Sequence, residues 1–497
     1  MSWVMRKRMH QIDLFRKYPH EVQEEWLQKL INNGKNTDFG KQYDFENIQN
    51  YEQFKTKTPI STYKDLENYI KSIRQGFQNI LWPSETKWFA KSSGTSGSKS
   101  KFIPVTEESL IDCHFKGGKD MLSIYCDNYP ETTIFNGKSL ILGGSHEASL
   151  NENGKEGDLS AIIMDNLPFW VNIHRTPSKD IALMNDFEAK IEKIANISSK
   201  ENVTNIAGVP SWMLVLFKRI LEETGAKHIH EVWPNLELYM HGGVSFSPYR
   251  KQFKELLPNG VNFLETYNAS EGFFGIQDKR NNEEMLLMLD YGIFYEFIPM
   301  DDYDLKKTVP IWGVEQDKNY ALVITTNAGL WRYLIGDTIT FTNTQPYRFK
   351  ITGRISQFIN TFGEELMIEN TDKALSIACQ KTNSNILEYT VAPIYMQSQN
   401  KGGHEWIIEF ESTPKDLDFF THALDDALKS VNSDYEAKRF KDMALKEPKI
   451  HIAKKNLFYQ WMKKQGKLGR QFKVPRLSNE RTHLESLLNL NNEPLNC

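Results

Sequence analysis

A run of small and hydroxylated residues carries the strongest chemical signal in this sequence. It is segment 91–101, which reads KSSGTSGSKSK and is followed by FIP. Small side chains let a backbone approach a phosphate closely, hydroxyls donate to its oxygens, and Lys99 and Lys101 add positive charge. The run is not a Walker A loop, because Lys99 occupies the place of that motif's second glycine. Its composition alone fits a flexible Ser/Gly linker equally well, but its apolar flanks favour a phosphate-binding loop.

Two later segments place polar groups where strands are expected to end. Segment 239–244, YMHGGV, ends on paired glycines that would let a planar group lie against the backbone, although a plain strand-to-turn connection is the favoured interpretation of this segment alone. Segment 266–272, TYNASEG, brings an aromatic ring, hydroxyls and the Glu271 carboxylate together just past an expected strand over 261–265. Such a carboxylate can hold Mg²⁺, which prefers oxygen ligands. A surface-turn role for Glu271 has the same weight on this pattern alone.

Three segments in the second half of the chain carry groups suited to a nucleotide. In WRYLIGD, residues 331–337, Asp337 follows a glycine and can accept two hydroxyl hydrogens from a ribose, or cap a turn. Arg354, in ITGR, can present a guanidinium to the same nucleotide or form a structural ion pair. The run 466–476, GKLGRQFKVPR, sets basic residues beside glycines and is typical of an anion-contacting loop. No histidines have zinc-ligand spacing, and no GxSxG elbow marks a hydrolase.

The pattern over the first 265 residues predicts an α/β body that brings these segments together. Apolar periodicity predicts helices over 20–33 and from Ser61 or Thr62 to Gly76. Further on, short apolar runs alternate with amphipathic segments, which predicts strands over 139–143, 203–207, 236–240 and 261–265 and helices over 211–223 and 248–257. This order favours a largely parallel sheet with crossover helices, whose ligands bind at the carboxyl ends of the strands.

The pattern changes after residue 285. Strands over 286–298, 320–326 and 337–342 with short connections predict an antiparallel or barrel-like subdomain. After Gly363 we expect a helix near 370–382, strands over 386–395 and 404–411, a helix over 416–430, a strand over 449–453 and a final helix. We therefore predict an α/β fold whose large N-terminal domain, residues 1–355, has mixed, largely parallel sheets and a β-barrel-like subdomain. A small C-terminal α+β domain, residues 356–497, would be a mobile lid with its hinge near 354–364.

The composition limits the partners. The 497 residues include 60 Lys and Arg and 64 Asp and Glu, a net charge of −4, which removes the electrostatic reason to expect nucleic acid or an anionic membrane as a partner. The longest apolar stretch, 212–217, is far short of the roughly 20 residues of a membrane span. The four cysteines form no CxxC pair, which fits a reducing compartment. We expect a cytoplasmic protein, a monomer or weak dimer, with small-molecule ligands.

The order of the motifs resembles that of the acyl-adenylate-forming superfamily. Along the chain the order is SSGTS at 92–96, Gly242-Gly243, YxxSE at 267–271, YxxGD at 333–337, Gly353-Arg354 and a lysine near the C-terminus. Within that superfamily the sequence is most similar to the auxin-responsive Gretchen Hagen family of acyl-acid amido synthetases, over essentially its whole length. The similarity is greatest at 92–95 with 101–104, at 267–275 and at 466–477.

The resemblance implies a role for each of these segments. The hydroxylated loop would hold ATP phosphates, Tyr267 would stack near the adenine, and Glu271 would hold Mg²⁺. Asp337 would take the ribose hydroxyls, and Lys473, with Lys467 in reserve, would reach the α-phosphate. The implied nucleotide-binding residues are Ser92, Ser93, Gly94, Thr95, Ser96, Gly243, Val244, Tyr267, Ser270, Asp337 and Arg354, and the implied catalytic residues are Glu271 and Lys473.

The resemblance also implies an activity, in which the protein uses ATP to adenylate a carboxylic acid and then transfers the acyl group to an amino acid amine. Two alternatives stay open, namely transfer to coenzyme A as a thioester, and a non-catalytic module that binds nucleotide and acyl ligand. The acyl pocket is expected between the N-terminal helices and the Tyr267 segment, and its candidate lining residues are Phe115, Trp170, His174 and Arg175. Two positions depart from the family pattern: Arg332 is one residue further from the Gly-Asp pair, and GEE at 363–365 lacks the lysine often found there.

Overall fold

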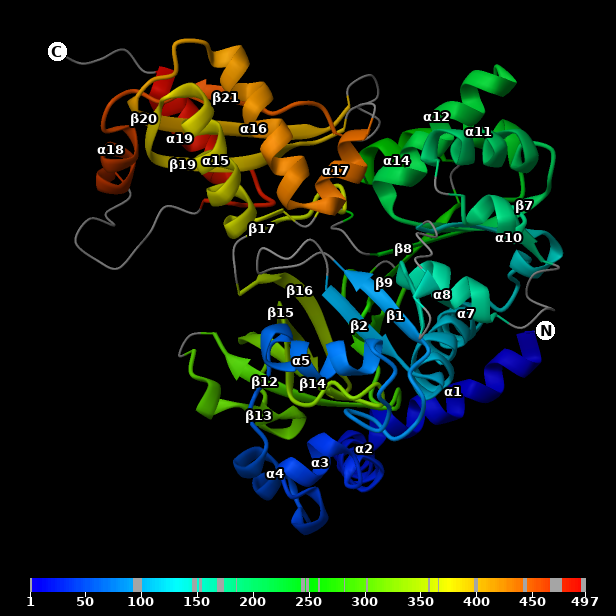
Figure 1. Ribbon diagram of the computed structural model, residues 1–497. Helices are drawn as coiled ribbons and strands as arrows, with labels where there is room; N and C mark the ends of the chain where they lie inside the picture. The colour runs from blue at the N-terminus through cyan, green and yellow to red at the C-terminus, as the bar shows by residue number, and fades with distance from the viewer. Residues whose placement is uncertain are drawn as a thin grey trace.

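The computed structural model describes most of the chain (Figure 1). The described residues are 2–92, 101–144, 150–151, 154–167, 174–184, 186–242, 246, 250–257, 260–280, 282–300, 303–355, 358–364, 366–396, 401–440, 445–464 and 476–492. Figure 1 shows two bodies. The elements from α15 onward, drawn yellow to red, form the C-terminal body, and the rest of the chain forms the N-terminal body.

Five helices open the chain. They are α1 (Ser2–Lys17), α2 (Pro19–Gly34), α3 (Asp38–Gln42), α4 (Tyr51–Lys57) and α5 (Tyr63–Arg74), with a 3₁₀ turn η1 (Phe45–Asn47). A proline begins α2, where the missing N–H would have had no partner within the helix. A capping box begins α5, in which the Thr62 backbone N–H donates to the Asp65 carboxylate at 2.8 Å. These two helices confirm the predictions over 20–33 and 61–76.

A mixed sheet of twelve strands forms the centre of the N-terminal body, in the order β13-β12-β14-β15-β16-β11-β10-β9-β8-β7-β3-β6. The last five strands in this order run parallel to one another and are β9 (Asn262–Ala269), β8 (Leu238–Gly242), β7 (Val203–Gly208), β3 (Lys138–Leu142) and β6 (Arg175–Thr176). The helices between them are α8 (Leu159–Asn166), α10 (Lys179–Ala182), α11 (Phe187–Ser198), α12 (Pro210–Thr224), α13 (Ile229–Val232) and α14 (Arg250–Leu256). The strands and helices predicted for this part are confirmed, apart from shifts at their ends.

The remaining strands of this sheet are antiparallel. They are β10 (Gly272–Ile276), β11 (Met285–Leu287), β12 (Ile293–Pro299), β13 (Val309–Pro310), β14 (Asn319–Thr326), β15 (Tyr333–Thr344) and β16 (Tyr347–Arg354), with 3₁₀ turns η4 (Leu305–Lys307) and η5 (Ile311–Gly313). The prediction of one strand over 286–298 was wrong, because Gly292 at φ 71° separates β11 from β12. The sheet is therefore mixed, and the antiparallel strands continue the parallel part within one sheet.

This sheet curls. The Tyr267 hydroxyl on β9 donates to the Asp337 carboxylate on β15, although β10, β11 and β16 lie between those strands in the sheet order. A flat sheet would hold the two strands about 19 Å apart, at four spacings of roughly 4.8 Å. The predicted barrel-like subdomain corresponds to this curled part of the sheet.

A second, four-stranded sheet packs beside the first and has the order β2-β1-β5-β4. Its strands are β1 (Trp88–Ser92), β2 (Lys101–Val105), β4 (Leu150–Asn151) and β5 (Gly154–Gly157). A continuous helical stretch follows β2 and consists of α6 (Glu107–Ser109), a π-helical segment η2 (Leu110–Phe115) and α7 (Lys116–Asn128), with a 3₁₀ turn η3 (Ile134–Asn136) beyond it. Buried residues of both sheets and of the N-terminal helices belong to one large apolar core.

The C-terminal body is α+β, as predicted. Its elements are β17 (Phe358–Ile359), β18 (Leu366–Met367), α15 (Ile368–Thr382), β19 (Asn385–Ile394), β20 (Gly403–Ser412), α16 (Leu417–Val431), α17 (Ser433–Arg439), β21 (Lys449–Ile452), α18 (Leu457–Lys464) and α19 (Thr482–Asn492). Glu405 on β20 binds Lys449, His451 and Arg481, each at 2.7 Å. The body touches the N-terminal one where the Lys438 ammonium lies 4.0 Å from the Trp212 ring of α12. Among the described residues, no helix is long and apolar enough to cross a membrane.

Candidate active site

The pairing of β15 with β16 builds the first part of the site. Asp337 and Arg354 are direct partners in the antiparallel register, so residues 17 positions apart in sequence lie opposite each other. Gly336 has φ 99°, a conformation that other residues rarely adopt, and its carbonyl accepts from the Ile355 N–H at 2.8 Å. The backbone at Gly336, inside β15, thus helps to fix the position of Asp337 opposite β16.

Tyr267 adds to the site from β9. Its hydroxyl donates to Oδ2 of Asp337, and its ring packs on Phe274 with the centroids 4.8 Å apart. Tyr267 and Asp337 are both buried, with exposed fractions of 7% and 8%. A carboxylate in such a place is held still by a charge-assisted hydrogen bond. The structure therefore brings together two predicted site residues that are 70 positions apart in sequence.

Ser270 and Glu271 form the turn between β9 and β10. The predicted strand 261–265 is too short, since β9 continues to Ala269 and pairs with β10 as far as Ala269↔Gly272. Tyr267 therefore lies within the strand, and only Ser270 and Glu271 lie beyond its end. Both side chains are half-buried. This places the Glu271 carboxylate at the tip of a hairpin that carries Tyr267 on its first strand.

The hydroxylated segment begins at the end of β1. Ser92 is the last residue of β1 and pairs in register with Lys101, the first residue of β2. Residues 93–100 of this segment lie outside the described part of the chain, and they include Lys99 and the predicted site residues Ser93, Gly94, Thr95 and Ser96. The other predicted site residues outside it are Gly243, Val244, Lys467, Lys473 and the pocket candidate Trp170.

Arg332, which shares a segment with Asp337, has a structural role. Its guanidinium binds Glu296 through Nη2 at 2.7 Å and Nε at 2.9 Å, and donates through Nη1 to the carbonyls of Lys55 at 2.9 Å and Thr58 at 2.6 Å. Arg332 is 3% exposed and Glu296 is fully buried. The spacing that departs from the family pattern thus leaves this arginine in the core, where it joins the N-terminal helices to β12.

The π-helical segment η2 packs directly on the β9–β10 hairpin. The Phe273 N–H donates to Sγ of Cys113 at 3.1 Å, and a Cβ at Gly117 would lie 2.6 Å from the Phe273 ring. Burial raises the pKa of the Cys113 thiol to about 12, so it remains protonated as an acceptor here. π-helical turns occur often at functional sites. This segment therefore fixes the hairpin that carries Glu271.

Sequence reasoning missed two residues at this contact, His114 of η2 and Asn268 of β9. Burial lowers the pKa of the His114 imidazole to about 4, and the neighbouring Asn268 side chain acts in the opposite direction. Nδ1 of His114 and Oδ1 of Asn268 are buried, and the two side chains are polar neighbours of each other. No spacing rule points to His114, whereas Asn268 lies inside the YxxSE motif.

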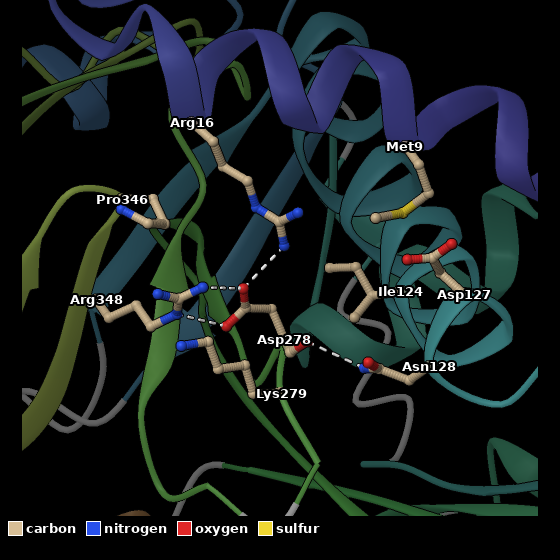
Figure 2. Close-up of a pocket in the computed structure, with 9 residues that line it drawn as sticks. All are labelled: Met9, Arg16, Ile124, Asp127, Asn128, Asp278, Lys279, Pro346 and Arg348. Carbon is tan, nitrogen blue, oxygen red and sulfur yellow. Dashed lines mark hydrogen bonds and ion pairs between the residues drawn. The ribbon is translucent and has the colours of Figure 1, made fainter.

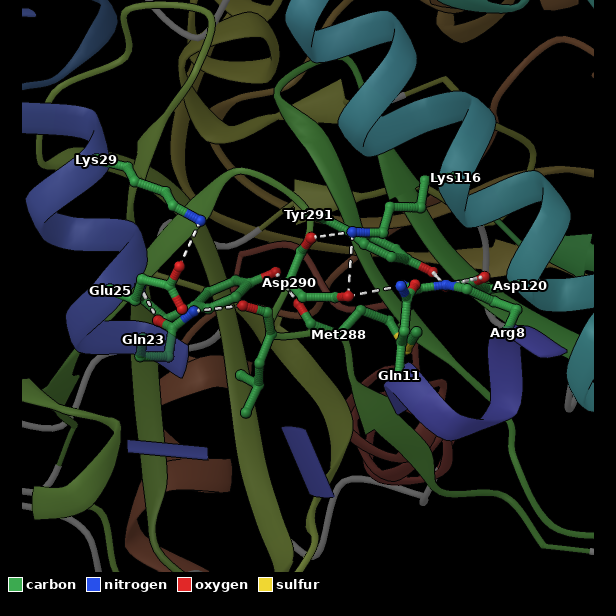
Figure 3. Close-up of polar contacts among 12 residues, drawn as sticks. Arg8, Gln11, Gln23, Glu25, Lys29, Lys116, Asp120, Met288, Asp290 and Tyr291 are labelled. Carbon is green, nitrogen blue, oxygen red and sulfur yellow. Dashed lines mark hydrogen bonds and ion pairs between the residues drawn. The ribbon is translucent and has the colours of Figure 1, made fainter. Parts of the chain in front are cut away.

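A buried ionic network anchors the base of α7 (Figure 3). The Arg8 guanidinium binds Asp120 at 2.7 Å and Asp290 at 2.7 Å, and Lys116 binds Asp290 at 3.0 Å. The Tyr291 hydroxyl donates to Asp120 at 2.8 Å. These contacts join α1 and α7 to the residues before β12, which holds η2 against the hairpin.

The remaining pocket candidates lie in different places. Phe115 ends η2 and packs, partly buried, against the main core. His174 is exposed in the turn before β6, and Arg175 is buried on β6. Since β6 is the outer strand of the sheet, four positions from β9, the structure brings Phe115 close to the hairpin but keeps His174 and Arg175 apart from it.

A hollow of about 310 Å³ lies at the opposite end of β16 from Arg354 (Figure 2). Its lining includes Arg16, Asp278 and Arg348. Figure 2 shows that both guanidinium groups point at the Asp278 carboxylate, and the distances are 2.8 Å from Arg16 and 2.7 Å from Arg348. These charges are already paired within the protein, so we assign no ligand to this hollow.

Comparison with known proteins places this geometry in context. Models of the GH3 family N-terminal, central and C-terminal domains match residues 8–262, 286–354 and 369–482. Indole-3-acetic acid-amido synthetase GH3.3 of Arabidopsis thaliana is 22% identical over 92% of this chain and 89% of its own length. Jasmonoyl–L-amino acid synthetase JAR4 of Nicotiana attenuata is 24% identical over 94% and 92%. The solved AtGH3.15 acyl acid amido synthetase in complex with 2,4-DB has the same fold, with a TM-score of 0.60 at 17% identity over 95% of this chain and 94% of that one.

Proposed function

The chain belongs to the GH3 family, and we propose that it is an ATP-dependent acyl acid amido synthetase. In this proposal it adenylates a carboxylic acid and joins the acyl group to the amine of an amino acid. The two relatives named above, which it matches along nine-tenths of its length, are an indole-3-acetic acid-amido synthetase and a jasmonoyl–L-amino acid synthetase. The predicted family and fold class are confirmed by these matches.

The observation that carries the proposal is the convergence at Asp337. Its carboxylate is fixed by the Tyr267 hydroxyl and stands in register with Arg354. A carboxylate held in this way can accept both hydroxyl hydrogens of a ribose, and a nearby arginine suits a phosphate or carboxylate. The nucleotide would therefore lie across the ends of β9, β15 and β16, with the residues from Ser92 to Ser96 on its phosphates.

Glu271 fits a role as a magnesium ligand. In the described part of the chain no three His, Cys, Asp or Glu residues gather into a self-contained metal site. Mg²⁺ needs no such cluster when one or two carboxylates and substrate phosphates hold it. A half-buried carboxylate at a hairpin tip beside the nucleotide site meets that need. When bound, the ion would neutralise phosphate charge.

A carboxylate must be activated before an amine can attack it, because its own leaving group would be oxide. A carboxylate oxygen of the acyl acid attacks the α-phosphorus of ATP, and the bond from that phosphorus to the pyrophosphate oxygen breaks. The amine nitrogen of the amino acid then attacks the acyl carbon, AMP leaves, and the nitrogen loses a proton. The protein's part is positioning and charge stabilisation. We assign Lys473 to the charge on the α-phosphate.

The division into residues 1–355 and 356–497 supports a moving lid. The Ile355 N–H is bonded to Gly336 of the N-terminal body, whereas the Asn360 N–H donates to Asn479 of the C-terminal body at 2.8 Å. The turning point would thus fall between residues 355 and 360. Domain closure of this kind would carry Lys473 toward and away from the nucleotide.

We also propose, from composition alone, a cytoplasmic protein that is a monomer or weak dimer and acts on small molecules. This proposal is supported by the net charge of −4 and by the four cysteines, which form no CxxC pair.

The function is tested by ATP–pyrophosphate exchange with a broad panel of carboxylic acids, followed by mass spectrometry of products from an acid-by-amino-acid matrix. We expect acid-dependent exchange and a new amide mass. Reactions with coenzyme A in place of the amino acid are run in parallel. A thioester without any amide would show that the protein is a coenzyme A ligase. ATP binding without exchange for any acid would show a non-catalytic module and overturn the proposal.

A further inference from the structure

Helix α17 of the C-terminal body contacts helix α12 of the N-terminal body. Figure 1 shows α17 at the boundary between the two bodies, where it faces the green helices. The Lys438 ammonium lies 4.0 Å from the centre of the Trp212 ring, whose electron-rich face attracts a cation. Lys438 is only 8% exposed, so water and salt screen this attraction little. The contact is therefore a buried cation–π pair between the two bodies.

The same lysine adjoins the segment that joins the bodies. A Cβ built on Gly363 would lie 3.3 Å from Cε of Lys438. One apolar cluster contains buried residues of both bodies, among them Phe217 of α12 and Phe362. The two residues of the cation–π pair belong to different bodies, so a rotation about residues 355–360 changes the distance between them. The contact thus belongs to the position of the C-terminal body that the structure shows.

A pair of like charges opposes this contact across the same boundary. Lys218 lies on α12, six residues beyond Trp212, and Lys401 lies just before β20 of the C-terminal body. Burial lowers the pKa of Lys218, the Glu222 carboxylate acts in the opposite direction, and the charge of Lys401 lowers the pKa further. The two ammonium groups therefore repel each other. Lys401 is exposed, so water and salt weaken this repulsion more than they weaken the buried cation–π pair.

We propose that Trp212 and Lys438 are positioning residues, which hold the C-terminal body docked as the structure shows it. The repulsion between Lys218 and Lys401 opposes docking, so the balance of the two interactions sets the fraction of docked molecules. The consequence for turnover rests on the proposed function, because adenylation and amide formation would need different positions of this body. A contact that favours one position favours the half-reaction that takes place in it.

Single-molecule fluorescence energy transfer on the whole chain tests the docking and needs no substrate. The dyes are attached at Lys193→Cys of α11 and Asp426→Cys of α16, which are exposed positions of the two bodies. Cys379→Ser and Cys497→Ser are introduced as well, because the other two cysteines are buried. Trp212→Leu takes away the ring that the buried ammonium faces. It should lower the ratio of docked to undocked molecules on the order of 5- to 30-fold, the value of a largely desolvated cation–π contact.

Three further variants separate the two interactions. Lys401→Glu should raise the ratio of docked to undocked molecules about two- to fivefold, because it replaces repulsion of Lys218 by attraction. Lys415→Glu reverses the charge of an exposed lysine ahead of α16, and this matched control should leave the ratio unchanged. The double variant Trp212→Leu/Lys438→Met should be docked more often than Trp212→Leu, since it no longer buries a charge that has lost its ring.

Turnover supplies the second readout. The ratio of amide synthesis to ATP–pyrophosphate exchange is measured with the acid and amino acid that give the most amide in the acid-by-amino-acid matrix. This ratio should shift in opposite directions in Trp212→Leu and Lys401→Glu. Equal loss of both rates in Trp212→Leu would show only a structural role and overturn this inference. Unchanged populations in Trp212→Leu, or a shift of both variants in one direction, would overturn it too. Absence of exchange with every acid overturns the proposed function instead, and the docked and undocked populations still test this inference.

Discussion

Replacing Arg332 with methionine should destabilise the protein without removing a catalytic group. Methionine keeps much of the length of the side chain but leaves Glu296, which is fully buried, without its bidentate partner. Two backbone carbonyls, those of Lys55 and Thr58, lose their donor in the same change. Breaking a buried ion pair from one side costs about 3–5 kcal/mol. We expect Arg332→Met to lower the free energy of unfolding by that amount.

The measurement is equilibrium unfolding in urea followed by tryptophan fluorescence, because Trp331 adjoins the mutated position. The double variant Arg332→Met/Glu296→Met removes the stranded charge as well. It should be about 2 kcal/mol more stable than Arg332→Met, since apolar replacement of a whole buried pair is far less harmful than removal of one partner. Arg219→Met is the matched control, because Arg219 pairs with Glu192 and Glu223 on the surface, and it should cost less than about 1 kcal/mol.

The reasoning fails if Arg332→Met unfolds within about 1 kcal/mol of the wild type. It also fails if the folded variant, assayed well below its unfolding midpoint, loses ATP–pyrophosphate exchange. The second result would give Arg332 a place in the active site, which its contacts with Glu296 and the N-terminal helices argue against.

Three other predictions concern binding, catalysis and pH. Asp337→Asn should raise KM for ATP on the order of 10- to 100-fold, the value of a charge-assisted hydrogen bond, and an unchanged KM in an ATP titration of the exchange reaction would contradict the ribose assignment. Lys473→Ala should slow exchange by about 100-fold or more, with Lys467→Ala within about threefold as its control, and the reverse result would move the role to Lys467. The pKa of Glu405 is about 2, because its basic partners outweigh the opposing effect of burial, against 4.5 for a free side chain. This stabilisation is complete above pH 4.5 and is lost as the pH falls toward 2, so the wild type should lose up to about 3 kcal/mol relative to Glu405→Gln in acid. The measurement is the free energy of unfolding of both proteins at pH 5, 4 and 3, and an equal decrease for the two proteins over this range would contradict the prediction.

Elements defined by local pattern were predictable. The end of α2 at Gly34 follows from Asn33-Gly34 after an apolar stripe, and the start of α5 follows from the capping residue Thr62 with Asp65 three positions later. The C-terminal order of helices and strands was predicted for the same reason. Each of these patterns depends on residues within one or two turns of one another, so no distant part of the chain is needed to interpret it.

Strands whose ends depend on pairing with other strands were not predictable from the sequence. Asn268 and Ser270 look like turn residues, yet β9 continues beyond its pairing with β8, which ends at Thr266, because Asn268 pairs with Phe273 of β10. Likewise, nothing near Gly292 shows that β11 and β12 lie far apart in the sheet, β11 beside β16 and β12 beside β14. Strand ends and strand neighbours depend on partners that the local sequence does not contain.

The residues of the candidate site also fall into two groups, those that sequence motifs predicted and those that they did not. Asp337, Tyr267 and Glu271 were predicted from sequence because they belong to an ordered set of motifs, and a ligand shared by a whole family demands fixed residue types and order. Arg332 shares a segment with Asp337, yet a positive φ of 42° at its own position turns its side chain toward Glu296 and the core. His114 belongs to no sequence motif itself, so no rule of spacing selects it, although it neighbours Asn268 inside the YxxSE motif. Only the packing of η2 against the β9–β10 hairpin brings His114 beside that motif, and such long-range packing cannot be predicted from the local sequence.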